Sequence, residues 1–316
     1  MSKDILIALG AGILSAFASL AFLFGLPGAL LAVYLAPLPL LLVGMDYGVK
    51  SGGIAGTTGI IVAGLLGGPL SALMFALIHT GPSWLIVRQA LLKRMAADGV
   101  TEEWYPSGYI LCLLSALAST ALIIAVILEL GAEGGLRGSV ESYLDQITGF
   151  LLPNVEASDR MKLVNAMAPL FPGYLGTSWV IMAAVNASIA VAILIRAARI
   201  ERPKTKLSEL ILPDWMSWAL VGVVSIALLS GGDLEYASRN IALVLSVPFF
   251  FLGLAVVHEL ARQVSFPGLL LSAFYLILIL SGWIGLVVIG AGLLEQWVGL
   301  RRHFVTRNDD PDENDH

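Results

Sequence analysis

His79 lies near the middle of a long apolar segment, just before the helix-disrupting pair Gly81-Pro82. Pro82 cannot donate a backbone hydrogen bond, and its ring crowds the carbonyl of Ile78, so we expect a broken helix here. An ionisable side chain at membrane depth is a functional candidate by default, because it could bind a ligand or relay a proton. It could equally bond a carbonyl freed by the break. His79 and its neighbour Thr80 are therefore candidate ligand-binding residues.

Asn186 and Thr57 are the other polar candidates inside apolar segments. Asn186 lies among alanines, where an asparagine commonly joins one helix to another. The Thr57 hydroxyl can bond its own helix backbone. Each could instead contact a solute, so a ligand site in this chain would draw on His79, Thr80, Asn186 and Thr57.

A second set of polar residues falls where apolar segments end on the side that we expect to be cytoplasmic. Snorkelling charges and interfacial ion pairs explain such residues most simply. A polar cluster that docks a cytoplasmic partner is the alternative. The set comprises Asp46, Lys50, Arg88, Glu259, Arg262 and Glu295.

Motifs for several chemistries are absent from the sequence. It has no P-loop, dinucleotide fingerprint, HExxH motif, nucleophile elbow or nucleic-acid signature. The four histidines lack metal-site spacing, and the single cysteine, Cys112, excludes internal disulfides and cysteine-based zinc sites. We expect no metal, no cofactor and no nucleic-acid partner, and we favour a protein without catalytic activity. Active transport would need an ion gradient or a separate ATPase.

The composition indicates a polytopic membrane protein. The 316 residues are 58% hydrophobic and 13% charged, with a mean hydropathy of +0.87, whereas soluble domains are about a quarter charged. We expect an all-α transmembrane bundle of eight to ten segments over residues 1–306 and a disordered acidic tail over 307–316. The ten candidate segments are Ile5–Phe24, Gly28–Met45, Gly53–Gly67, Pro69–Val87, Gly108–Leu130, Gly173–Ile195, Asp214–Ser230, Asn240–His258, Pro267–Ser281 and Trp283–Gly299.

Basic loop residues indicate the orientation. With ten segments they all fall on one side, which the positive-inside rule makes cytoplasmic together with both termini. A single long final helix would instead put Arg301 and Arg302 outside. We expect a bacterial inner-membrane protein with a basic cytoplasmic linker over 196–212. The basic residues on that side are Lys3, Lys50, Arg88, Lys93, Arg94, Arg196, Arg199, Arg202, Lys204, Lys206, Arg262, Arg301 and Arg302.

Small residues recur at helical spacing in two of the segments. Such a face lets another helix backbone come close, which drives helix association in lipid. We expect the glycine-rich hairpin that turns at Gly67-Gly68-Pro69 to be the buried centre of the bundle. The first segment could pack within the chain or dock another membrane subunit. The predicted packing residues are Ala8, Gly12 and Ala16 in the first segment and Gly52, Gly56, Gly59, Ala63 and Gly67 in the third.

The outer loop over residues 131–172 carries two amphipathic patterns. Apolar residues repeat at helical spacing from Val140 to Leu151, with Ser139 placed to cap the helix start. Residues 159–168 predict a second short helix. These helices either lie on the membrane surface or form a lid over an outward-facing cavity. Asp214 is placed to cap the helix that follows the linker.

Two stretches carry a family resemblance. A proline-bearing second segment runs into the glycine-rich third, APLPLLLVGMDYGVKSGGIAG at 36–56, and a glycine-bearing hairpin followed by arginines ends the apolar chain at 282–302. In this layout the chain resembles the YybS-like family of bacterial membrane proteins. The resemblance implies a bundle similar to the S-components of energy-coupling-factor transporters and to the rod-shape protein MreD, with helices added to the roughly six of an S-component. The resemblance also implies that Ala8, Gly12 and Ala16 pack against the transmembrane coupling subunit of such a transporter.

These observations favour a membrane protein that binds or transports a small, partly apolar solute from the outer side. A membrane scaffold similar in role to MreD is the alternative. A lipid-modifying enzyme is the third hypothesis, and it would need a convergent cluster of acids, bases or a metal. The expected partners are the lipid bilayer, a small solute and other membrane subunits.

Overall fold

The computed structural model describes residues 2–25, 27–95, 100, 102–203 and 207–301, and these are almost entirely helical. The predicted all-α, multi-pass bundle is confirmed. By length and composition, five helical stretches among the described residues can cross a membrane, or six if a pair bent by 119° counts as one span. The five are Ala29–Tyr47, Val49–Ala90, Ser107–Leu128, Ala157–Arg196 and Gly232–Ala261, and the bent pair is Pro267–Leu280 with Ile284–Val298. The predicted tail over 307–316 lies outside the described residues.

The chain divides into two compact units. Unit 1 contains residues 1–110 and 181–205, and unit 2 contains residues 111–180 and 206–316. The chain passes between them within two long helices, α6 (Ser107–Leu128) and α9 (Phe171–Arg196).

Unit 1 is built around a helical hairpin. Helix α4 (Val49–Phe75) contains one non-helical residue, Gly68, with φ 83° and ψ 178°. Only glycine adopts this conformation readily, and Pro69 begins the return arm. The arm continues through a π-helical turn (Ala76–Thr80) into α5 (Gly81–Ala90). The predicted turn at Gly67-Gly68-Pro69 is therefore present.

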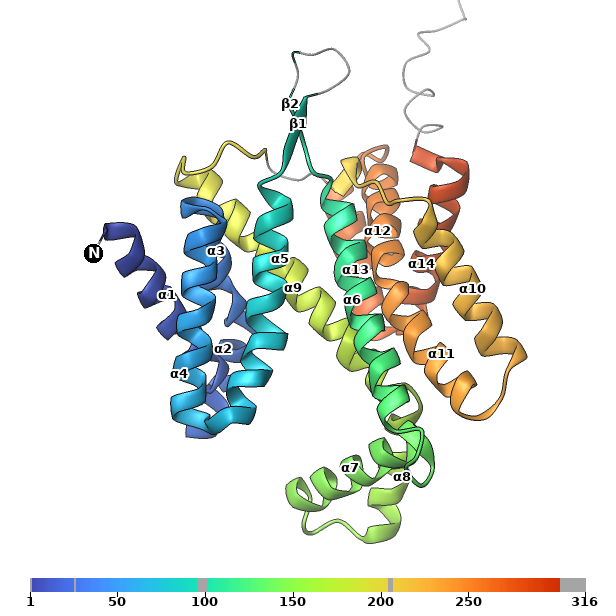
Figure 1. The fold of residues 1–316 in the computed structure, drawn as a ribbon. Coiled ribbons are helices and arrows are strands. Elements are labelled where there is room, and N and C mark those ends of the chain that lie inside the picture. The colour runs from blue at the N-terminus through green and yellow to red at the C-terminus, as the bar shows by residue number, and fades with distance from the viewer. Residues whose placement is uncertain (1, 26, 96–99, 101, 204–206, 302–316) are drawn as a thin grey trace, which may run out of the picture. The chain divides into compact units, whose positions relative to one another are not determined.

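Two helices pack against this hairpin, α1 (Lys3–Ser19) and α3 (Pro37–Tyr47). Between them in the chain, a short 3-10 turn (Ala21–Phe24) follows α1, and α2 (Ala29–Leu35) contacts this turn and α1. Helix α1 has its most extensive contacts with α4, and α3 contacts both arms of the hairpin. In Figure 1 these elements form the blue and cyan part of the chain.

A short antiparallel β-ribbon, which the sequence analysis did not predict, follows α5. Strand β1 (Lys93–Met95) pairs with β2 (Glu102–Trp104), and Lys93 lies opposite Trp104. The ribbon projects beyond the end of α5 (Figure 1). Its two cross-strand ion pairs, Lys93–Glu102 at 2.9 Å and Arg94–Glu103 at 2.8 Å, hold the register.

Unit 2 has its core where α10, α11 and α12 meet the extended segment before α10. The helices are α10 (Trp215–Leu229), α11 (Gly232–Leu245), α12 (Val247–Ala261), α13 (Pro267–Leu280) and α14 (Ile284–Val298), with a 3-10 turn (Leu207–Glu209) before them. The closest helix pair is α12 with α14, where Gly253 faces the Val288 carbonyl and Gly292 faces the Phe249 carbonyl. The core residues are Cys112, Leu210, Leu212, Met216, Leu220, Ile241, Leu245, Phe249 and Leu252.

The loop over residues 131–172 contains the two predicted helices, α7 (Gly135–Leu151) and α8 (Ala157–Met167), followed by a 3-10 turn (Ala168–Leu170). Ser139 does not cap α7, because the helix begins four residues earlier, after Gly134 with φ 76°. The Ser139 hydroxyl instead donates to Glu129 at 2.6 Å. Asp214 occupies the N-cap position of α10, but its carboxylate accepts a bond from Gln296 instead of a helix N–H.

Candidate functional site

His79 lies inside the π-helical turn of unit 1. The Gly81 N–H donates to the Ala76 carbonyl five residues back, which widens the helix just before Pro82. The predicted break at this proline is therefore a widened turn, and the helix continues without interruption. Such π-turns inside helices are frequent at functional sites. The His79 side chain is only 3% exposed and its ring centroid lies 5.3 Å from that of Phe75.

The imidazole has an unused hydrogen-bonding atom. Among the described residues, Nδ1 of His79 has no hydrogen-bond partner. The same is true of the buried hydroxyl of Ser83, one helical turn further along α5. Side chains four residues apart share a helix face. Burying a polar atom without a partner is costly, so each such atom in a native protein calls for an explanation.

Glycines let the two arms of the hairpin approach closely. A side chain on Gly56 would collide with Thr80, and one on Gly59 would collide with Phe75, the residue against which His79 packs. The Thr80 hydroxyl lies 3.4 Å from the Gly56 carbonyl. The glycines therefore set how closely the first arm of the hairpin approaches the arm that carries His79. Thr80 lies where the two arms meet.

The small-residue face of α1 covers the other side of the first arm. Ala8, Gly12 and Ala16 are buried, and a Cβ on Gly12 would collide with the Ala55 carbonyl. Helix α3 approaches the arm where Gly52 faces Gly44. The predicted ridge on α4 lies mostly on the buried side, with Gly52, Gly56, Gly59 and Ala63 buried and Gly67 half-buried against Ser71.

The remaining predicted ligand residues, Thr57 and Asn186, form hydrogen bonds that do not involve His79. Thr57 is exposed and donates to the Gly53 carbonyl at 2.9 Å. Asn186 is fully buried and donates to the Tyr34 and Met182 carbonyls, both at 2.8 Å. Its Oδ1 has no partner among the described residues. The structure provides no contact that joins Thr57 or Asn186 to His79.

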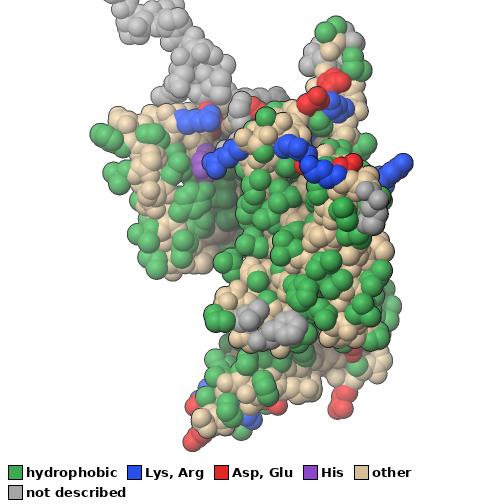
Figure 2. Space-filling model, turned by 90° about the vertical axis from the view of Figure 1, so that its left-hand side faces the viewer, with side chains coloured by type: hydrophobic (Ala, Val, Ile, Leu, Met, Phe, Trp, Pro, Cys, Tyr) green, Lys and Arg blue, Asp and Glu red, His purple; other side chains and the backbone are tan. Residues whose placement is uncertain are grey.

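The charged residues of unit 1 gather at one end of its helices. Asp46 at the end of α3 forms a bidentate pair with Arg199, with bonds of 2.8 to 3.1 Å. This pairing raises the pKa of Arg199. Arg88 stacks on Trp84, 5.6 Å from the ring centroid, and Lys50 is exposed. Figure 2 shows a band of Lys and Arg side chains above a largely hydrophobic surface.

Arg202 ties the end of unit 1 together. Its buried guanidinium donates to the carbonyls of Ala90 at 2.6 Å and Tyr105 at 2.8 Å. Burial lowers its pKa, although a guanidinium stays charged. Lys93 lies 4.5 Å from the centroid of the Trp104 ring and bonds Glu201 at 2.9 Å. The bond from Lys93 lowers the pKa of Glu201.

The predicted cytoplasmic polar residues are divided between the two units. The members in unit 2 form two separate pairs. Glu259 pairs with Arg262 on α12 at 3.2 Å, and Glu295 pairs with Arg301 at 2.7 Å, with both side chains at most 15% exposed. The three members in unit 1, Asp46, Lys50 and Arg88, have the separate surroundings described above.

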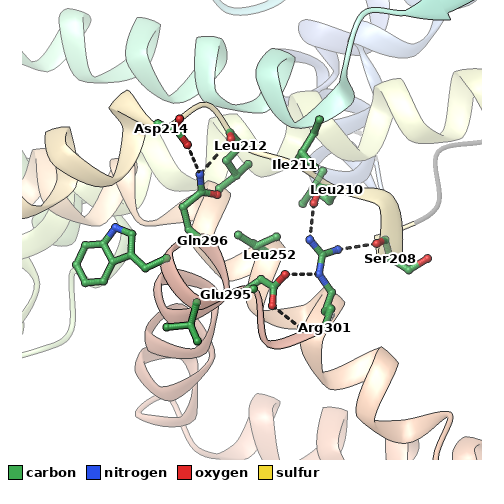
Figure 3. Close-up of a pocket in the computed structure, with 12 residues that line it drawn as sticks. Ser208, Leu210, Ile211, Leu212, Asp214, Leu252, Glu295, Gln296 and Arg301 are labelled. Carbon is green, nitrogen blue, oxygen red and sulfur yellow. Dashed lines mark hydrogen bonds and ion pairs between the residues drawn. The ribbon is translucent and has the colours of Figure 1, made fainter. Parts of the chain in front are cut away.

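A pocket of about 640 Å³ lies beside the Glu295–Arg301 pair (Figure 3). Arg301 donates to the carbonyls of Ser208 and Leu210, and its own N–H donates to Glu295. Gln296 donates to the Leu212 carbonyl at 3.2 Å. These bonds fasten the end of the linker onto α14. Three of the five guanidinium N–H donors bond the protein and Glu295 pairs with the charge, so this arrangement holds a backbone segment in place.

Sequence reasoning missed Ser83 and the carbonyl partners of two arginines. Ser83 could have been found from its spacing of four from His79. Arg202 was assigned only to the positive-inside count, and Arg301 to that count and to an interfacial pair with Glu295, because a basic residue near a helix end carries no signal of which carbonyl it will meet. Gly253 and Gly292 were missed because they lie in different apolar segments, and neither segment alone contains a ridge.

A family model for a predicted membrane protein family, DUF2232, matches residues 12–294. The chain belongs to this family. No curated protein and no solved structure matches the chain. Membership in DUF2232 agrees with the multi-pass helical fold, and the family description assigns no activity.

Proposed function

We propose that this DUF2232 protein binds a small solute at the π-helical turn of unit 1 and takes part in its transport across the membrane. The pair of buried, unpartnered polar atoms on one helix face, Nδ1 of His79 and the hydroxyl of Ser83, carries the proposal. A solute with a hydrogen-bonding group would satisfy both atoms. The Phe75 ring beside His79 suits a solute that is partly apolar.

The comparison with other hydroxyls supports this reading. In unit 1 the hydroxyls of Thr57, Thr58 and Ser71 each donate to the carbonyl four residues earlier. Ser83 has no such bond. The buried hydroxyls of Ser115, Ser119 and Ser217 also have no partner among the described residues, so what distinguishes Ser83 is its place one helical turn from the unpartnered His79 at the π-turn. We also propose an S-component-like role, in which the energy comes from elsewhere because the sequence has no P-loop with which to hydrolyse ATP.

The proposal is tested by what the purified protein carries. Small molecules are extracted from protein purified in mild detergent and quantified by mass spectrometry for the wild type, His79→Phe and Ser83→Ala. We expect a compound near one equivalent in the wild type and at least a tenfold loss in His79→Phe. Ser188→Ala is the matched control, because Ser188 is exposed and bonds its own helix. Equal amounts of the compound in wild type and His79→Phe, or none in either, would refute solute binding at this turn.

A scaffold role similar to that of MreD is the second candidate. The β-ribbon favours it, because this ribbon projects from the charged end of unit 1 and Met95 is 56% exposed on it. A protein that co-purifies with the wild type and is lost on replacing Met95 with Ser, with no bound small molecule, would favour assembly over transport.

A further inference from the structure

We propose that the α7–α8 hairpin of unit 2 is a membrane-surface element whose exposed apolar side chains insert into the lipid interface. The hairpin forms its own small core, in which Val140 and Leu144 of α7 pack against Val164 of α8 and against Ala168. Outside that core it exposes further apolar side chains, of which Tyr143 also contacts the Phe171 ring, with ring centroids 6.4 Å apart. These exposed apolar residues are Tyr143, Phe150, Leu151, Leu152, Met161, Leu163 and Met167, and Phe150 is 85% exposed.

The connections of the hairpin keep it at the membrane boundary. Only residues 129–134 join the end of α6 to the start of α7, and Ser139 is bonded back to Glu129 across this connection. On the other side, α8 leads through Ala168–Leu170 directly into the apolar helix α9. Figure 1 shows α7 lying across the direction of α6 at its end. Six residues cannot carry the hairpin far from the end of a spanning helix.

Three side-chain hydrogen bonds from α11 fix the corner between α8 and α9. Tyr236 donates to the Ala168 carbonyl at 2.9 Å. Asn240 donates to the Pro169 carbonyl at 3.0 Å and accepts from the Gly173 N–H at 2.7 Å. The corner therefore holds the hairpin at a set angle to α9 instead of leaving it on a loose tether.

The apolar surface continues onto the spanning helix. Tyr174 and Leu175, in the first turn of α9, are more than half exposed. Lipid covers such a helix, so the same lipid reaches the exposed residues of α7 and α8 next to it. Tyrosines at this level are typical of the membrane interface. Two charged pairs of the hairpin bond locally, Arg137–Glu141 and Lys162–Asp159, both at 2.8 Å.

The occupant is therefore the bilayer, as for amphipathic helices that lie in the interface plane. The test uses the full chain with Cys112, its single cysteine, replaced by alanine. A cysteine at Phe150 carries an environment-sensitive fluorophore in phosphatidylethanolamine/phosphatidylglycerol vesicles. Asp145→Cys is the matched control, because it lies on the same helix about 140° away at 100° per residue. Nitroxide-labelled lipids report which fluorophore contacts the bilayer.

We expect the label at residue 150 to be quenched by lipid nitroxides at least threefold more than the label at residue 145. Equal, weak quenching of both labels would overturn the proposal. Efficient cross-linking between two copies of the Phe150→Cys chain, with little lipid quenching, would also overturn it, because a second copy of the chain would then cover these residues. The result is independent of the solute experiment, which concerns unit 1 alone.

Discussion

Asn240 takes the place of a backbone hydrogen bond at the start of α9. In a regular helix the Gly173 N–H would bond the Pro169 carbonyl, but here the amide of Asn240 lies between them and bonds both. Pro172 has no N–H to offer the Ala168 carbonyl, and the Tyr236 hydroxyl bonds this carbonyl instead. The asparagine also bonds the Tyr236 carbonyl at 2.8 Å. Two side chains of α11 thus satisfy a proline-disrupted corner.

Replacing Asn240 with leucine keeps the branching of the side chain but removes all three bonds, leaving a buried N–H and a buried carbonyl without a partner. We expect the free energy of unfolding to fall by about 1 to 3 kcal/mol, measured by thermal or denaturant unfolding in detergent. Asn154→Leu, at an exposed loop position, should change it by less than about 0.5 kcal/mol. Equal stability of the Asn240 variant and the wild type would show that the corner does not depend on this side chain.

Single residues in this chain were predictable as candidates, but their partners were not. The sequence singled out His79 and Asn186 by their polarity in apolar segments. It could not show that Asn186 donates to the Tyr34 carbonyl, because Tyr34 is 152 residues away in the sequence. Asn240 was assigned only to the start of a span, because its partners at the α8–α9 corner lie about 70 residues away.

Glycines decide how close the helices approach, and their effect depends on which face they occupy. On α1, Gly12 and Gly10 are two residues apart. A Cβ at Gly12 would collide with the Ala55 carbonyl and lie 2.8 Å from Thr58, whereas a Cβ at Gly10 would meet nothing within 4 Å. An alanine at Gly12 therefore reports the effect of close helix packing, and an alanine at Gly10 reports the effect of helix propensity alone.

Gly12→Ala should push α1 away from α4 and lower the free energy of unfolding by about 1 to 3 kcal/mol, the usual cost of overpacking. Gly10→Ala should be neutral or raise it by up to about 1 kcal/mol, because alanine is the better helix former. The apparent melting temperatures of the two purified variants measure the difference. If Gly12→Ala melts at or above the wild type, the backbone contact between α1 and α4 does not hold unit 1 together.

At the scale of elements, strong patterns predicted structure and weak ones did not. The turn at Gly68 and the helices α7 and α8 follow from glycine-proline spacing and from amphipathic periodicity. The start of α7 at Gly135 was missed because glycine gives no capping signal there. The β-ribbon was missed because its strands have three residues each and are rich in charge, so they lack the alternation that marks a strand.

The overall class of the molecule is its most predictable property, because composition and segment length determine it. The number of membrane crossings is harder to predict. Helices α13 and α14 meet at a bend of 119° between Leu280 and Ile284. Such a pair is a single broken span, a re-entrant loop that enters and leaves on the same side, or two separate crossings. Apolar length is the same in all three cases, so hydropathy cannot distinguish them.

The basic residues argue against a single broken span, and of the two arrangements that remain we expect two crossings. Arg262 before α13 and Arg301 after α14 both belong to unit 2, and the positive-inside rule puts both in the cytoplasm. Two crossings then place Gly282, at the bend, on the outer side. In spheroplasts of a strain that expresses the Cys112→Ala chain, Gly282→Cys should react with a membrane-impermeant maleimide, as should Glu133→Cys. Ser2→Cys should react only after lysis. If Gly282→Cys reacts only after lysis while Glu133→Cys reacts before it, the pair is a re-entrant loop. In that case α13 and α14 would not cross the membrane. Both arginines would still lie in the cytoplasm, because a loop that returns to its own side leaves the positive-inside pattern unchanged.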